Sequence, residues 1–178
     1  MIIIPGWLIA LVTFPGVIVH EAAHMLFCKI RGLAVLDVCF FRMGNPSGYV
    51  IHEHSEDFTS IFLVAVGPFI VNSVLCFLFC FPAFVPVKIF EQEDLISYFL
   101  IWLGISIGMH AFPSTGDAQV LMEGAKKAAR QMNLLAIASY PLVGIIYVAN
   151  LLRFFWFDAI YGIALGFLLP EWILKEAA

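Results

Sequence analysis

The 29 residues from Thr59 to Val87 carry no charged side chain, and this feature most limits the folds open to the chain. A membrane-spanning helix needs about 20 consecutive apolar residues, so the run is ample for one span. Of the 178 residues, 62% are hydrophobic and only 12% are charged, whereas a soluble domain is typically about 25% charged. The sequence therefore predicts an all-α polytopic membrane protein that forms one integral-membrane domain over residues 1–178.

Charge and cysteine content exclude several other classes of protein. The net charge of −4 is spread along the chain, and no basic cluster indicates nucleic-acid binding. The first residues lack the positive segment and cleavage site of a signal peptide, so we expect Met1–Cys28 to be retained as a membrane segment. The four cysteines fall in or near apolar runs and are expected to be buried apolar side chains rather than a disulfide framework.

Five apolar segments are predicted to span the bilayer. They are Ile2–Ile30, Thr59–Val87, Leu95–Phe112, Leu134–Leu152 and Ala159–Leu174. In the first segment, Pro5, Trp7 and Pro15 predict an interfacial stretch before a regular helix. Gly32, just after this segment, is expected to end that helix.

Two shorter segments are predicted to lie at the membrane surface. Val35–Phe41 and Gly48–His52 are rich in β-branched and aromatic residues and flank a turn at residues 44–47, which predicts a β-hairpin. The hairpin could cap the bundle, or its edge could add an extended peptide as a further strand. Ala118–Gln131 has one apolar side among charged residues, which predicts an interfacial helix.

Positive charge predicts the orientation of the bundle. Seven Lys or Arg residues follow the first, third and fifth predicted spans, and two follow the second and fourth. The seven are Lys29, Arg31, Arg42, Lys126, Lys127, Arg130 and Lys175, and the two are Lys88 and Arg153. Because positive loops stay in the cytoplasm, we expect the N-terminus outside and the C-terminus inside.

The first apolar segment contains the motif HExxH, as His20-Glu21-Ala22-Ala23-His24. On a helix, positions i and i+4 lie on one face, so His20 and His24 can offer two imidazoles to one Zn²⁺. Glu21 is then placed to take a proton from a water molecule. Ionisable side chains at membrane depth are costly unless they serve a function. The segment therefore predicts one zinc ion per chain, with Glu21 as the catalytic residue, at the cytoplasmic end of the first span.

A hydrolytic zinc site usually has three protein ligands, so a third is needed. Asp117 is the favoured candidate because it follows a predicted span in a Pro/Gly-broken loop. Ser114-Thr115-Gly116-Asp117 also fits a capping-box pattern, in which Asp117 would only cap a helix. His110 could form a hydrogen bond to one of the zinc ligands, or it could be a histidine at the membrane interface. The remaining candidates, for which a solvated surface is an adequate explanation, are His52, Glu53 and His54.

Gly67-Pro68 lies in the middle of the second apolar run. Proline there would kink a helix and free carbonyl groups, although the pair could instead serve close helix packing. Asn72, one turn later, is polar at membrane depth. It either holds helices together or binds the substrate carbonyl as that becomes an oxyanion.

These features, in this order, resemble the site-2 protease family of intramembrane zinc metalloproteases. The resemblance covers roughly residues 17–121, and its most specific part is HExxH followed by the aspartate loop. It implies that His20, His24 and Asp117 bind zinc, that Glu21 is the catalytic base and that Asn72 binds substrate or oxyanion. It also implies that the hairpin holds the substrate extended.

The chain departs from the family pattern in two places. The aspartate of the family usually stands in a Leu-Asp-Gly setting, whereas here Gly116 and Ala118 flank it. The asparagine usually comes three residues after the proline, whereas Asn72 comes four after Pro68. No PDZ-like domain fits into the chain, so it would be a minimal core.

The expected function is hydrolysis of peptide bonds in membrane-embedded or membrane-proximal protein substrates. The alternative is a metal-binding membrane protein without peptidase activity, either a divalent-ion carrier or a scaffold derived from a protease. A third possibility is a structural bundle in which the HExxH motif is accidental. The expected partners are the lipid bilayer and a transmembrane or membrane-proximal protein substrate.

Overall fold

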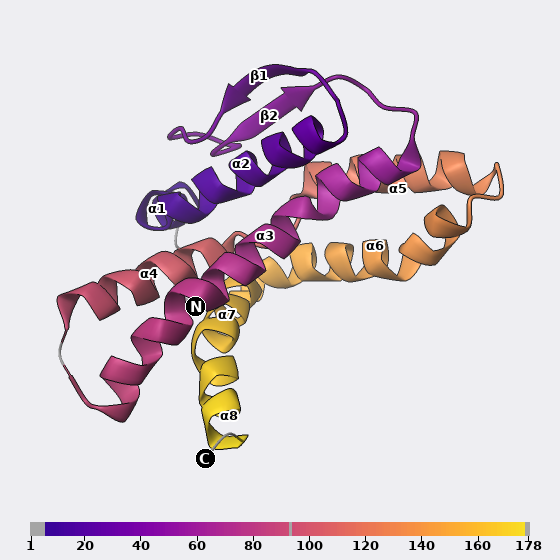
Figure 1. Cartoon of the computed structure of the whole chain (residues 1–178). Helices are drawn as coiled ribbons and strands as arrows, with labels where there is room; N and C mark the ends of the chain where they lie inside the picture. The colour runs from indigo at the N-terminus through magenta and orange to yellow at the C-terminus, as the bar shows by residue number, and fades with distance from the viewer. Residues whose placement is uncertain (1–5, 93, 177–178) are drawn as a thin grey trace.

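The computed structural model describes residues 6–92 and 94–176 of the chain, and it is mainly helical (Figure 1). The helices are α1 (Gly6–Val12), α2 (Phe14–Ile30), α3 (Phe58–Phe84), α4 (Leu95–Met109), α5 (Thr115–Ala129), α6 (Leu134–Leu152), α7 (Phe157–Ile163) and α8 (Leu169–Glu176). Short π-helical or 3₁₀ segments, Val85–Ile89, Arg153–Phe155 and Ala164–Leu168, extend or join them. Strands β1 (Val35–Cys39) and β2 (Tyr49–His52) form a two-stranded sheet.

Within the described residues, three helical stretches are long and apolar enough to cross a membrane. They are Phe58–Ile89, Leu134–Phe155 and Phe157–Glu176, and the α1–α2 pair makes a fourth if it counts as one broken span. This agrees with a polytopic membrane protein, but it does not support the predicted count of five. Helix α4, predicted as the third span, has only 15 residues, which is about 22 Å of helix against a hydrocarbon core of about 30 Å.

The first predicted span is broken. Helices α1 and α2 meet at 88°, and Thr13 lies at the break, where its hydroxyl donates to the carbonyl of Ile9. Pro15 stands in the first turn of α2, where a missing N–H leaves no helical hydrogen bond unmade. Pro5, which was expected in the same interfacial stretch as Pro15, lies outside the described residues. Gly32 ends α2 as predicted, with a left-handed φ of +69°.

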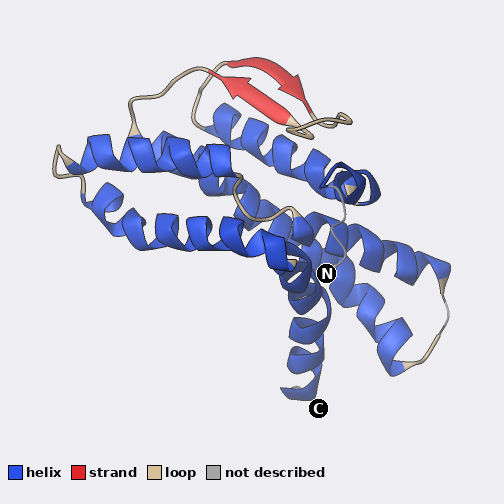
Figure 2. Cartoon of the chain, turned by 180° about the vertical axis from the view of Figure 1, so that it is seen from behind, coloured by secondary structure: helices blue, strands red, loops and turns tan. Residues whose placement is uncertain are grey.

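The predicted hairpin is confirmed. Its strands pair antiparallel, with Cys39 opposite Tyr49 and Val38 opposite Val50. The hairpin lies along α2, on the side away from α4 (Figure 1). The same relation is seen from behind in Figure 2, where the red strands cover the helix that carries the HExxH motif.

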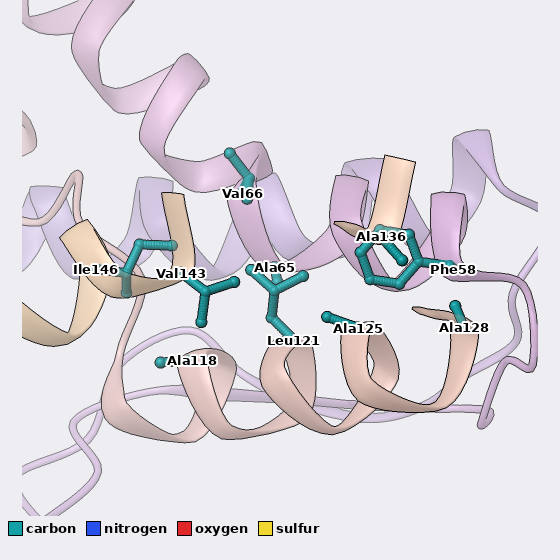
Figure 3. Packing of buried hydrophobic residues seen from close by; sticks show 10 residues of the cluster. All are labelled: Phe58, Ala65, Val66, Ala118, Leu121, Ala125, Ala128, Ala136, Val143 and Ile146. Carbon is teal, nitrogen blue, oxygen red and sulfur yellow. The ribbon is translucent and has the colours of Figure 1, made fainter. Parts of the chain in front are cut away.

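Helix α5 confirms the predicted amphipathic segment and packs more closely than a surface helix needs to. Its buried residues Leu121 and Ala125 meet Ala65 of α3 and Val143 of α6, and they form the main apolar cluster of the described structure (Figure 3). Val120 of the same helix is 52% exposed. The helix therefore packs against both α3 and α6.

Helices α3, α4 and α7 pack through small residues. A Cβ atom at Gly104 of α4 would lie 2.4 Å from Sγ of Cys80, and one at Gly108 would lie 2.7 Å from Sγ of Cys76. Each thiol thus fills a space that a glycine leaves open, as is usual where membrane helices approach closely.

Gly104→Ala should destabilise the bundle, because the added methyl overlaps a buried thiol and the adjoining α3 backbone. We expect a loss of about 1–3 kcal/mol, the usual cost of overpacking, measured as a lower thermal midpoint in detergent. Gly144→Ala on α6 is the matched control, since a Cβ atom there meets nothing within 4 Å. Equal midpoints for the two variants would contradict this packing.

Candidate metal site

The two imidazoles of the HExxH motif and the carboxylate of Asp117 converge on one point. Nε2 of His24 lies 3.2 Å from Nε2 of His20 and 3.5 Å from Oδ1 of Asp117, and Nε2 of His20 lies 3.9 Å from Oδ2 of Asp117. Zinc bonds of about 2.0–2.1 Å in a tetrahedral arrangement place ligand atoms roughly 3.3 Å apart. Among the described residues, this is the one group of three His, Cys, Asp or Glu side chains with such spacing.

Main-chain carbonyls fix the orientation of both histidines. Nδ1 of His20 lies 2.6 Å from the carbonyl oxygen of His110, and Nδ1 of His24 lies 2.9 Å from that of Val64. A carbonyl oxygen only accepts, so each Nδ1 carries a hydrogen, and in the neutral form of each ring Nε2 presents a lone pair. Two lone pairs 3.2 Å apart in a buried site repel each other, and a cation between them removes that repulsion. The residues therefore fit a divalent metal.

Asp117 is both a helix cap and a member of the cluster, so the capping-box interpretation is confirmed and the ligand interpretation stays a prediction. Its Oδ2 accepts hydrogen bonds from the main-chain N–H and the hydroxyl of Ser114, at 2.7 and 2.6 Å. The hydroxyl of Ser114 accepts from the N–H of Asp117, which completes a capping box. With Oδ2 held in this way, Oδ1 is directed at His24. Burial alone would raise the pKa of Asp117, but when the rings of His24 and His20 are protonated, their positive charge lowers this pKa well below its ordinary value.

The loop before α5 is tied to the end of α6. Asn150 donates its side-chain N–H to the carbonyl of Pro113 at 3.1 Å, and Arg153 donates to the carbonyl of Phe112 at 3.0 Å. These bonds fix the two residues that precede the capping box. They explain how Asp117 is held against a helix about 90 residues earlier in the chain.

Glu21 lies beside the two imidazoles and under the hairpin. Its side chain is largely buried, with 9% of its surface exposed, and it lines a cleft of about 1510 Å³ together with His20, His24 and Asp117. Gly48, just before β2, approaches it so closely that a Cβ atom there would lie 2.7 Å from Cγ of Glu21. The hairpin loop therefore covers the glutamate, and a glycine is required at this point.

The remaining predicted site residues lie behind or away from the cluster. Asn72 is fully buried, and its Nδ2 donates to the carbonyls of Gly16, Ile107 and His110. This amide holds α2, α3 and the end of α4 together, and the oxyanion role stays a prediction. His110 contacts His20 through its carbonyl, while its ring pairs with the hydroxyl of Thr13 at 2.8 Å.

The histidines of the hairpin serve other contacts. Nδ1 of His52 donates to the carbonyl of Glu53, and Nε2 of His54 lies 3.3 Å from Oε1 of Glu56. Both side chains line the outer part of the cleft and not the ligand cluster.

Sequence reasoning missed three features of the cleft. The carbonyls of Val64 and His110 orient the histidines, and only the proline four residues after Val64 gives any sign of this in the sequence. Gly48 could have been noticed only as a glycine next to a strand. Arg153 and Asp158 form an ion pair of 2.7 Å that lines the cleft.

Comparisons of the chain with models of known protein families, with curated proteins and with solved structures found no match. Any conclusion about its function therefore depends on the geometry of the cluster and its cleft.

Proposed function

We propose that this chain is an intramembrane zinc metalloprotease of the site-2 protease type, which hydrolyses peptide bonds in membrane-embedded or membrane-proximal proteins. One observation carries the proposal. Asp117, about 90 residues after the HExxH motif, brings its free carboxylate oxygen to 3.5 Å from His24, while Glu21 stands in the same cleft. An accidental HExxH motif has no reason to acquire a third ligand, or two carbonyls that direct both histidines toward it.

The roles of the residues follow from their positions. His20, His24 and Asp117 would hold the metal, and a zinc ion bound there would supply a Lewis acid that polarises a carbonyl and makes water more acidic. Glu21 takes the proton from the attacking water and gives it to the leaving amine. The hairpin and α2 exclude bulk solvent from the glutamate, which strengthens its interactions in the cleft.

The substrate is a peptide in an extended conformation. Residues 49, 50 and 52 of β2 line the cleft, and among the residues that the structure describes, β2 pairs only with β1. A substrate strand can add to the other edge of β2 and bring its carbonyl near the metal ligands. A transmembrane helix has its carbonyls in internal hydrogen bonds, so the substrate must unwind locally before it binds.

We place the N-terminus outside and the cleft near the cytoplasmic face, with α4 as a short fifth crossing. Support for this comes from the excess of Lys and Arg after the predicted odd-numbered spans. The ligands are then within two or three turns of the cytoplasmic end of α2, where water can reach the cleft.

Purified protein in detergent tests the proposal. It should contain one zinc ion per chain and cleave fluorescein-labelled casein, whose unfolded segments need no unwinding. The chelator 1,10-phenanthroline should stop cleavage, and added Zn²⁺ should restore it, because the ligands remain in place. Lys126→Ala on α5, a change outside both the cluster and the residues that line the cleft, is the control and should behave as the wild type. Protein with a full complement of zinc that cleaves neither casein nor a single-span reporter would argue for a metal-binding protein without peptidase activity.

A further inference from the structure

The carbonyl of Val64, which orients His24, lies inside a membrane helix. Carbonyls in such a helix normally accept a hydrogen bond from the main chain of the same helix. In an α-helix, the carbonyl of residue i accepts the N–H of residue i+4. For Val64 in α3, that residue is Pro68, which has no N–H to give. The oxygen of Val64 instead lies 2.9 Å from Nδ1 of His24, and both groups are buried.

The residue before this proline lets α2 come close enough for that bond. A Cβ atom at Gly67 would lie 2.1 Å from Cδ2 of Phe27, which follows His24 by one helical turn. Any larger side chain at this position would push α2 away from α3. Gly67 therefore allows the close approach of α2 to α3, and Pro68 leaves the carbonyl of Val64 free to accept from His24.

The other histidine is oriented in a similar way, by different means. Its acceptor, the carbonyl of His110, lies just beyond Met109, the last residue of α4. The N–H four residues later, on Ser114, donates to Asp117 and not to His110. The carbonyl of His110 can accept from His20 because α4 ends there and gives it no helical partner. Helix α3 continues past Val64, so the carbonyl of Val64 lacks a helical partner only because residue 68 is a proline.

We propose that Pro68 is a positioning residue for the metal site. Because it lacks an N–H, the carbonyl of Val64 accepts from Nδ1 of His24, which fixes the ring with the lone pair of Nε2 toward Asp117 and His20. This inference rests on the proposed metal site. It assigns the proline to ligand orientation rather than to a kink or to packing alone.

The test is the zinc affinity of purified Pro68→Ala protein, measured in detergent by competition with a chromophoric chelator. Alanine restores an N–H that competes for the carbonyl of Val64, and we expect the dissociation constant to rise about tenfold, the lower end of the usual effect of losing an outer-shell partner. Pro82→Ala is the matched control: it removes the other proline of α3, on an exposed part of the helix, and should leave zinc affinity unchanged. The absorption spectrum of the Co²⁺-loaded protein should change only in Pro68→Ala.

A second variant separates the missing N–H from the ring of the proline. The α-hydroxy analogue of alanine, incorporated at position 68, has an ester oxygen in place of the N–H and should bind zinc as tightly as the wild type. Weak binding by this analogue, or wild-type affinity in Pro68→Ala, would overturn the assignment of Pro68. His24→Ala serves as the reference. If His24→Ala also keeps full affinity, the metal site itself is wrong and the proposed function fails with it.

Discussion

Glu21→Gln should abolish peptide hydrolysis and leave zinc bound. Glutamine keeps the size of the side chain but cannot take a proton, and a general base typically contributes roughly 10²–10⁴-fold to the rate. Glu21 does not contribute an atom to the three-ligand cluster, so the metal content should stay at one per chain. The measurement is the initial rate of casein cleavage together with zinc analysis of the same sample.

Glu123→Gln on α5 is the control, because Glu123 is not one of the residues that line the cleft. The cleavage rate and the zinc content together show whether Glu21 is the base, a metal ligand or neither. A variant that keeps both zinc and the wild-type rate would remove Glu21 from the mechanism. A variant that loses zinc would make Glu21 a ligand, and the distances among His20, His24 and Asp117 would then need another explanation.

The helices and the hairpin could be predicted because each depends on local sequence. Long apolar runs specify α3 and α6 whatever their neighbours, and turn residues between β-branched segments specify β1 and β2. The 88° break in the first span was not predictable in this way. It is accompanied by a hydrogen bond between Thr13 and His110, which are almost 100 residues apart. The predicted crossing by α4 stays a prediction, because this helix has only 15 residues.

The pairing of His20 with His24 could also be predicted, because a helix fixes the relation of the two side chains. The carbonyls that orient the two rings could not be predicted, since they depend on contacts between helices. The sequence offered two interpretations of Gly67-Pro68, freed carbonyls or close packing, and the structure contains both, in the contacts of Val64 and Phe27. Asp117 likewise caps α5 and lies beside the imidazole of His24. Asn72 differs, because its amide is already bonded to three carbonyls.

Asp117→Ala should lose tight zinc binding. It removes one of three ligand atoms, so the dissociation constant should rise by more than roughly 100-fold, beyond the usual effect of losing an outer-shell partner. Equilibrium dialysis with Zn²⁺ measures this directly. Asp117 also caps α5, so a loss of affinity in this variant alone could reflect a loosened helix.

Two further variants separate the ligand from the cap. In Asp117→Asn, the amide oxygen can still accept from the N–H of Ser114, so α5 should keep its stability while zinc affinity falls as in Asp117→Ala. In Ser114→Ala, the hydroxyl of the capping box is lost, and we expect about 0.5–2 kcal/mol lower stability. The carboxylate and the N–H that orients it remain there, so zinc affinity should fall no more than about tenfold. Full zinc affinity in Asp117→Asn would leave Asp117 as a cap only, because the neutral amide would then serve as well as the carboxylate.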